Sequence, residues 1–166
     1  EECSLSQLSG VVLAEEIFTD YLYMSSVSKA LVRHYQGLID YLIKKFNLKE
    51  GQAVMDIGAN DGIMLDRYPK DKFKTIGVEP SQLSEVARKK GHIIYHNFFN
   101  EACAQQILKE KGSVKLITAT NVFAHIDDIH SVVKGIKLLF NKESLFVIET
   151  PYVVDMVEKN YFDTIY

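Results

Sequence analysis

The chain has 166 residues, the size of one ordinary domain. Lys and Arg together number 19 and Asp and Glu 22, so the formal net charge of −3 offers no basic surface for nucleic acid. Hydrophobic residues at 47% and charged residues at 25% exclude a disordered or fibrous chain. No apolar run approaches the roughly 18 residues of a membrane span. We therefore expect neither a nucleic-acid nor a membrane partner.

Two cysteines, Cys3 and Cys103, are too few for a disulfide framework, which suits a reducing cytoplasm. We expect Cys103 to be a small buried residue of a helix. The chain begins with Glu rather than Met, and residues 161–166 carry no terminating signal. We therefore expect a piece of a longer protein.

The first part of the chain is predicted to be helical. Residues 1–25 form an irregular lead-in with a helical turn at 14–18, and apolar side chains recur at helical spacing over 26–46. Those side chains are Val27, Leu31, Tyr35, Leu38, Leu42 and Phe46. We assign residues 1–48 to this N-terminal lead-in and long helix, and residues 49–166 to the domain proper.

Short apolar runs then alternate with stretches that are compatible with helices. The predicted strands are 53–57, 75–78, 92–95, 115–119 and 145–148, and the predicted helices are 61–68, 82–90, 101–111 and 128–140. This alternation predicts an α/β, Rossmann-like fold with a mostly parallel sheet and helices on both faces. In such a sheet the ligand lies beyond the carboxyl ends of the strands.

The first predicted strand runs into a glycine turn at residues 56–62, with Asp56, Gly58, Asn60 and Gly62 as candidate cofactor contacts. Glycine permits a tight turn and close approach of a ligand. The spacing is neither that of a dinucleotide site nor that of a phosphate loop with its lysine. At the start of the next helix Asp61 is expected to repel pyrophosphate, yet tolerate a ligand that bears ammonium and sulfonium groups.

The second predicted strand ends at Glu79, which is followed by Pro80 and lies 17 positions after Gly62. A carboxylate at that place can accept hydrogen bonds from a ribose diol. Together the turn and the acid predict S-adenosylmethionine as the cofactor rather than a phosphate-rich nucleotide. The alternative is an ordinary glycine turn and a solvated glutamate at a strand end.

Residues after the third and fourth predicted strands complete the expected cofactor site. Asn97 is placed at the adenine edge, with Phe98 or Phe99 over its face, unless both rings belong to the core. Asn121 is expected to form the floor beneath the methionine part. His125 joins these cofactor neighbours as a polar residue at a helix start, a role that we favour over that of a catalytic base.

Six segments carry a family resemblance over nearly the whole chain: residues 20–28, 56–62, 77–81, 121–126, 149–152 and 162–166, which read DYLYMSSVS, DIGANDG, GVEPS, NVFAHI, ETPY and FDTIY. On these the chain resembles the sugar C-methyltransferases that act on nucleotide-linked 4-keto-deoxysugars, a branch of the class I S-adenosylmethionine-dependent methyltransferases. The resemblance implies an enzyme that methylates a ring carbon through an enolate, with a nucleotide-linked sugar as its substrate.

The resemblance also implies catalytic residues. Tyr21, Tyr23 and Tyr166 would face the sugar and donate to an oxyanion or relay a proton. Members of the family usually continue after the FDTIY segment with His-Glu-His of the catalytic centre, so we expect this piece to bind cofactor with little or no turnover. They begin with a zinc module, of which Cys3 resembles the tail. One cysteine cannot hold zinc alone, so we predict no metal.

Three other functions stay open at this point. The chain could be an O- or N-methyltransferase of small molecules, which needs less help from a base. It could be a non-catalytic domain that still binds S-adenosylmethionine. A nicotinamide-dependent oxidoreductase is disfavoured by Asp61 and by the glycine spacing.

Overall fold

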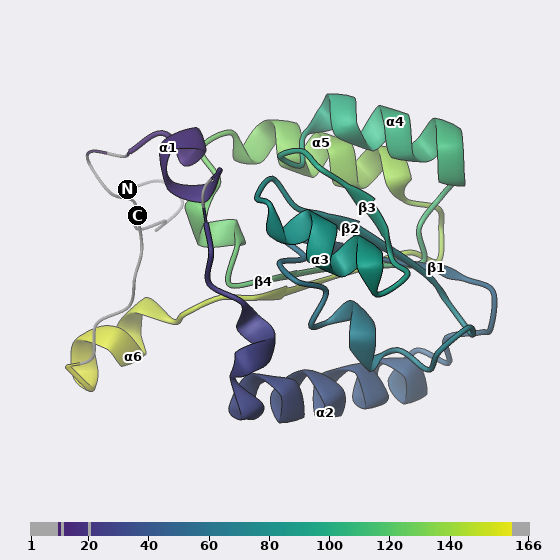
Figure 1. The fold of residues 1–166 in the computed structure, drawn as a ribbon, viewed down its shortest axis with the longest axis horizontal. Coiled ribbons are helices and arrows are strands. Elements are labelled where there is room, and N and C mark those ends of the chain that lie inside the picture. The colour runs from purple at the N-terminus through teal and green to yellow at the C-terminus, as the bar shows by residue number, and fades with distance from the viewer. Residues whose placement is uncertain (1–9, 11, 20, 161–166) are drawn as a thin grey trace.

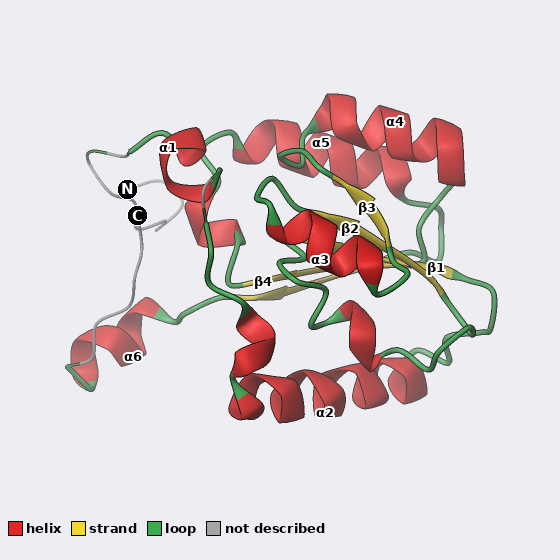
Figure 2. Cartoon of the chain, viewed as in Figure 1, coloured by secondary structure: helices red, strands yellow, loops and turns green. Residues whose placement is uncertain are grey.

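The computed structural model describes residues 10, 12–19 and 21–160. Its strands are β1 Ala53–Ile57, β2 Lys74–Val78, β3 Ile93–Tyr95, β4 Leu116–Thr120 and β5 Leu145–Glu149. Its α-helices are α1 Ala14–Phe18, α2 Lys29–Lys45, α3 Leu83–Lys89, α4 Glu101–Lys111, α5 Ile129–Leu139 and α6 Val153–Glu158. Single 3₁₀ turns occur at η1 Ser25–Val27, η2 Leu65–Arg67 and η3 Phe123–His125 (Figure 2). None of the helices in these ranges is long and apolar enough to cross a bilayer.

All five strands form one parallel sheet in the order β3-β2-β1-β4-β5 (Figure 1). The chain builds outward from β1 through β2 to β3, then returns to the other side of β1 for β4. The order therefore reverses between β1 and β4, and a crevice at the carboxyl ends of these strands is where open parallel sheets bind ligands. The predicted α/β fold with a parallel sheet is confirmed.

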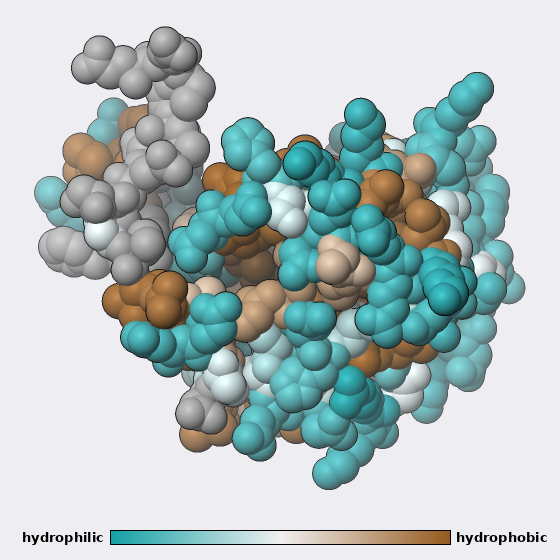
Figure 3. Space-filling view, turned by 90° about the horizontal axis from the view of Figure 1, so that it is seen from above, coloured by the Kyte–Doolittle hydropathy of each residue, from teal (hydrophilic) through white to brown (hydrophobic). Residues whose placement is uncertain are grey.

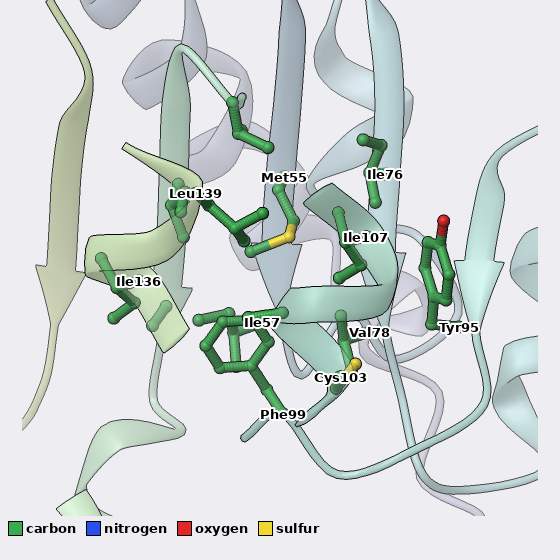
Figure 4. Packing of buried hydrophobic residues seen from close by; sticks show 14 of the residues in the cluster. Met55, Ile57, Ile76, Val78, Tyr95, Phe99, Cys103, Ile107, Ile136 and Leu139 are labelled. Atoms are coloured by element: carbon green, nitrogen blue, oxygen red, sulfur yellow. The ribbon is translucent and has the colours of Figure 1, made fainter. Parts of the chain in front are cut away.

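Helices cover both faces of the sheet, and alternate residues of each strand pack against different helices. Met55 and Ile57 of β1 point toward α4 and α5, where they join Ile107 and Leu139 in one core cluster (Figure 4). Val54 of β1 belongs to a second cluster on the opposite face, formed with α2 and α3. Because both faces of β1 and β4 are buried, these strands lack the alternation of polar and apolar residues that a half-exposed strand shows.

Helix α2 begins later than predicted. The Ser28 hydroxyl accepts a hydrogen bond from the Leu31 N–H (3.3 Å) and caps the helix at its N-terminus. The extended backbone of Ser28 separates α2 from η1, so residues 26–28 are not part of the long helix. The buried face of α2 carries Tyr35, Ile39 and Leu42.

The helix predicted over residues 61–68 is wrong. Gly62 has a φ of +83°, which a continuous α-helix does not tolerate, and only η2 forms in this stretch. Helix α6 was not predicted. None of its residues is buried, so it has no amphipathic pattern directed at the core.

Candidate cofactor and acceptor site

A cavity of about 870 Å³ lies at the carboxyl ends of the central strands. Its wall is built from α1, the start of α2, the loops after β1, β2, β3 and β4, and the N-terminal ends of α4 and α5. Figure 3 shows hydrophobic side chains at the bottom of a hollow on the face seen from above, with hydrophilic side chains around it. The site therefore lies at the edge of the sheet that the strand order indicates.

The turn after β1 forms one side of this cavity. Gly58 has a φ of +71°, and a Cβ at this position would lie 2.3 Å from Val122 Cγ2. Its N–H donates to the Val78 carbonyl (2.8 Å), as does the N–H of Ala59 (3.1 Å). Only glycine fits here, because any other residue would be strained at this positive φ and its Cβ would clash with Val122 in the loop after β4.

Glu79 lies at the end of β2 with its carboxylate held in a fixed orientation. Its Oε2 accepts a hydrogen bond from the Asn60 N–H (2.8 Å), and its Oε1 accepts one from the Ser81 N–H (3.0 Å). The residue lines the cavity and is only 6% exposed. Each carboxylate oxygen keeps further acceptor capacity, so the group can still accept hydrogen bonds from a ligand.

The charge of the cavity wall is negative. Among the described lining residues there is no Lys or Arg, and the acidic ones are Glu15, Glu79, Glu101, Asp127 and Asp128. The sequence of the residues outside the described ranges contains no Lys or Arg either. A cleft lined by one sign of charge attracts the opposite sign. The wall therefore favours a cation over a diphosphate.

The predicted role of Asp61 was wrong. Its side chain is fully buried and does not line the cavity. Lys90 Nζ lies 3.5 Å from Asp61 Oδ2 and donates to the Asp61 backbone carbonyl at 2.6 Å. This side chain lies beside a lysine and not at the cavity, so the acidic residues of the cavity wall are the ones that would face a pyrophosphate.

Asp56 and Gly62 were expected at the cofactor, but neither lines the cavity. The Asp56 carboxyl lies inside the core, where Oδ1 accepts from the Thr118 hydroxyl at 2.6 Å. Burial raises the pKa of Asp56 to about 8, and the nearby charge of Glu79 acts in the same direction. Gly62 packs away from the cavity, because a Cβ there would meet His92 Cδ2 at 3.0 Å. Both residues therefore lie at or next to the turn after β1, on the side that faces the core and not the cavity.

The other predicted residues within the described ranges do line the cavity: Tyr21, Tyr23, Gly58, Asn60, Glu79, Pro80, Asn97, Phe98, Asn121 and His125. Asn121 has a φ of +55°, and its N–H donates to the Glu149 carbonyl at 2.8 Å, which fixes the loop after β4. Tyr166 and Cys3 lie outside the described residues.

Aromatic rings form a row along the N-terminal side of the cavity. The Phe18 ring lies 5.6 Å from the His125 ring and 5.9 Å from the Tyr21 ring, centroid to centroid. The Tyr21 and Tyr23 rings meet edge to face at 6.4 Å. Phe18 and Tyr35, which also line the cavity, were not predicted to do so. In the sequence each resembles an apolar residue of a helix that packs in the core. Only the positions of the surrounding loops in the fold show that each one lines the cavity.

Cys103 is buried in α4, as predicted, and burial raises the pKa of its thiol to about 11. A thiol of that pKa is a poor nucleophile at neutral pH. Within the described ranges, no three His, Cys, Asp or Glu side chains gather closely enough to hold a metal ion.

Sequence comparison relates the chain to methyltransferases. The profile of the methyltransferase domain family matches residues 30–165. The C-methyltransferase NovU of Streptomyces niveus is 30% identical over 165 residues, which cover 99% of this chain. The chain spans 39% of the length of that relative.

Solved structures of methyltransferases share the fold. A putative S-adenosylmethionine-dependent methyltransferase from Methanococcus maripaludis superposes with a TM-score of 0.58 at 16% identity, over 81% of this chain and 68% of that one. The plantazolicin methyltransferase BpumL, solved with a triazolic desmethylPZN analog and S-adenosylhomocysteine, has a TM-score of 0.63 at 13% identity, over 84% of this chain and 55% of that one. The chain thus belongs to the methyltransferase domain family and has the Rossmann-like fold of class I methyltransferases.

Proposed function

We propose that this chain binds S-adenosylmethionine in the cavity and takes part in methyl transfer. The observation that carries the proposal is the fixed, nearly buried Glu79 carboxylate in a cavity whose described wall contains no Lys or Arg. Glu79 would accept hydrogen bonds from the ribose, a role that suits an acid at the end of β2. Asn97 and Phe98 would hold the adenine, and Asn121 would lie beneath the methionine part.

For the acceptor, we propose a ring carbon of a nucleotide-linked 4-keto-deoxysugar. The support is the likeness to NovU and the presence of Tyr21 and Tyr23 on the cavity wall. When bound, S-adenosylmethionine supplies an electrophilic methyl group on a sulfonium. A base must take the α-proton of the ketone, and the resemblance assigns that role to a histidine that follows the FDTIY segment in the family. The enolate carbon would then bond to the methyl group as the bond from methyl to sulfur breaks, while a tyrosine hydroxyl donates to the enolate oxygen. Phenols have an ordinary pKa of about 10, so these groups are donors at neutral pH.

The proposal is tested by methyl transfer from labelled S-adenosylmethionine to three acceptor classes: a nucleotide-linked 4-keto-deoxysugar, a panel of phenols and a panel of amines. We expect label on the ring carbon of the sugar and on neither of the other two classes, at the low rate that the resemblance implies for this piece. Label on phenols or amines would instead support an O- or N-methyltransferase. Cofactor binding with no detectable transfer to any class would overturn the proposed acceptor role of this chain and leave only its cofactor binding.

The variant Tyr23→Phe keeps the aromatic contact with Tyr21 and removes the hydroxyl. Tyr41→Phe is its matched control, because Tyr41 lies on the exposed face of α2 and does not line the cavity. If Tyr23 donates to the enolate, Tyr23→Phe lowers the rate of transfer about 10- to 100-fold and leaves cofactor affinity unchanged. Equal rates for the two variants would remove Tyr23 from the reaction.

A further inference from the structure

The side chain of Asn60 joins two parts of the cavity wall that are far apart in the sequence. Its Oδ1 accepts a hydrogen bond from the Ser25 N–H (2.9 Å), and its Nδ2 donates to the Tyr23 carbonyl (3.0 Å). Ser25 is the first residue of η1, so Asn60 caps this turn from outside. We name residues 21–25 the tyrosine segment, because Tyr21 and Tyr23 of this segment face the cavity.

The backbone of Asn60 contacts the proposed cofactor site. Its N–H donates to Glu79 Oε2 at 2.8 Å, on the carboxylate that would accept the ribose hydroxyls. Asn60 has a φ of +51°, a left-handed conformation that asparagine tolerates better than most residues. One residue thus connects Glu79, through its backbone, to the tyrosine segment, through its side chain.

The tyrosine segment depends on its hydrogen bonds with Asn60 because it buries little side-chain surface. Tyr23 is 51% exposed and Leu22 is 78% exposed. Its neighbouring turns are short: α1 has five residues and η1 has three. Segments with few buried apolar contacts open at low free-energy cost, so two hydrogen bonds from a well-packed loop are a large share of what holds this one in place.

We propose that Asn60 is a positioning residue that couples cofactor binding to the placement of Tyr21 and Tyr23 on the acceptor side. This inference rests on the proposed function, since it takes Glu79 as the ribose acceptor. Hydrogen bonds from a ligand to the Glu79 carboxylate would further stabilise the arrangement in which that carboxylate accepts from the Asn60 N–H, and through Asn60 the side-chain amide that holds the tyrosine segment. Cofactor binding then organises the acceptor side, and by linkage an ordered acceptor side tightens cofactor binding.

Hydrogen exchange at the Ser25 amide, measured with and without S-adenosylhomocysteine, tests this coupling. The variant Asn60→Gly removes both side-chain hydrogen bonds and keeps the left-handed backbone without strain. Asn60→Asp keeps the acceptor for the Ser25 N–H and removes the donor to the Tyr23 carbonyl. Asn47→Gly is the matched control, because Asn47 has a φ of +50° and lies after α2, outside the cavity.

In the unaltered chain and in Asn47→Gly, we expect S-adenosylhomocysteine to slow exchange at Ser25 about tenfold. In Asn60→Gly we expect about tenfold faster exchange without ligand and no further slowing when the ligand binds. Asn60→Asp is expected to keep most of the protection at Ser25, because the oxygen that accepts from the Ser25 N–H remains. Each pattern is read only from protein whose core amides in β1 and β4 stay protected.

Equal slowing at Ser25 in Asn60→Gly and in the unaltered chain would overturn the proposal. So would an unaltered chain that binds S-adenosylhomocysteine without any change at Ser25, and in that case the proposed function would stand. If the unaltered chain does not bind S-adenosylhomocysteine at all, the proposed function falls and the coupling falls with it, even where the Asn60 variants still differ from the control without ligand.

Discussion

The Glu79 carboxylate accepts backbone hydrogen bonds on both of its oxygens, so its replacement has two effects. Glu79→Gln removes the negative charge that faces the cavity and turns an amide N–H₂ toward one of the two backbone donors. We expect the Kd for S-adenosylhomocysteine, measured by calorimetry, to rise about 10- to 100-fold. Glu85→Gln, on the exposed side of α3, changes charge equally and is expected to bind as the unaltered chain does. Equal affinities for both variants would contradict the ribose role.

The buried Asp56 carboxyl gives folding a pH dependence. Burial raises its pKa from 3.8 to about 8, so the folded chain binds this proton more tightly than the unfolded chain does. The stability that this contributes is fully present below about pH 4 and is lost as the pH rises through 8. Asp56→Asn keeps an oxygen for the Thr118 hydroxyl and carries no charge at any pH.

We therefore expect Asp56→Asn to be about 1–3 kcal/mol more stable than the unaltered chain at pH 9, with a smaller difference at pH 5, in urea unfolding. Asp155→Asn serves as the control, because Asp155 forms an ion pair with Lys159 on the surface of α6. A stability difference for Asp56→Asn that is the same at both pH values would show that the carboxyl is ionised in the folded chain.

Single residues differ in how far the sequence reveals their role. Glu79 and Gly58 were predicted to belong to the site because their positions follow from strand ends and local turns. Asp61 was placed wrongly because the direction of its side chain depends on Lys90, which follows 29 positions later. The contacts of Asn60 with Tyr23 and Ser25 span more than 30 residues and have no local signature.

At the scale of elements, helix α4 shows how burial sets stability. Ile107 is fully buried against the sheet, whereas Leu108, the next residue, is 37% exposed. We expect Ile107→Ala to lower the free energy of unfolding by about 2–5 kcal/mol and Leu108→Ala by less than about 1 kcal/mol, measured by urea denaturation. Comparable losses for the two variants would mean that α4 does not pack as described.

The strands were predicted to within one residue because a doubly covered sheet requires continuous apolar runs. The predicted helix at 101–111 coincides with α4, where Asn100 caps the first turn by accepting from the Cys103 N–H at 2.9 Å. The prediction over 61–68 failed because two turn-forming features, Gly62 and the buried Asp61, override the helical spacing of the residues that follow. Local pattern decides an element only where tertiary contacts agree with it.

At the scale of the whole molecule, strand order and charge act together. The reversal between β1 and β4 produces the crevice, and acidic side chains from α1, the loop after β2, α4 and the loop before α5 line the same cavity there. The composition, with a net charge of only −3, gave no hint of this concentration. The concentration of acidic side chains emerges from the fold, and we expect it to disfavour diphosphate ligands.

Calorimetric titration of the full chain with S-adenosylmethionine, and in parallel with NAD, tests the central claim most directly. The geometry of Glu79 and the acidic wall predict saturable one-to-one binding of the sulfonium nucleoside, weakened by Glu79→Gln, and no heat of binding with the dinucleotide. Saturable binding of NAD, together with no binding of S-adenosylmethionine, would contradict the account.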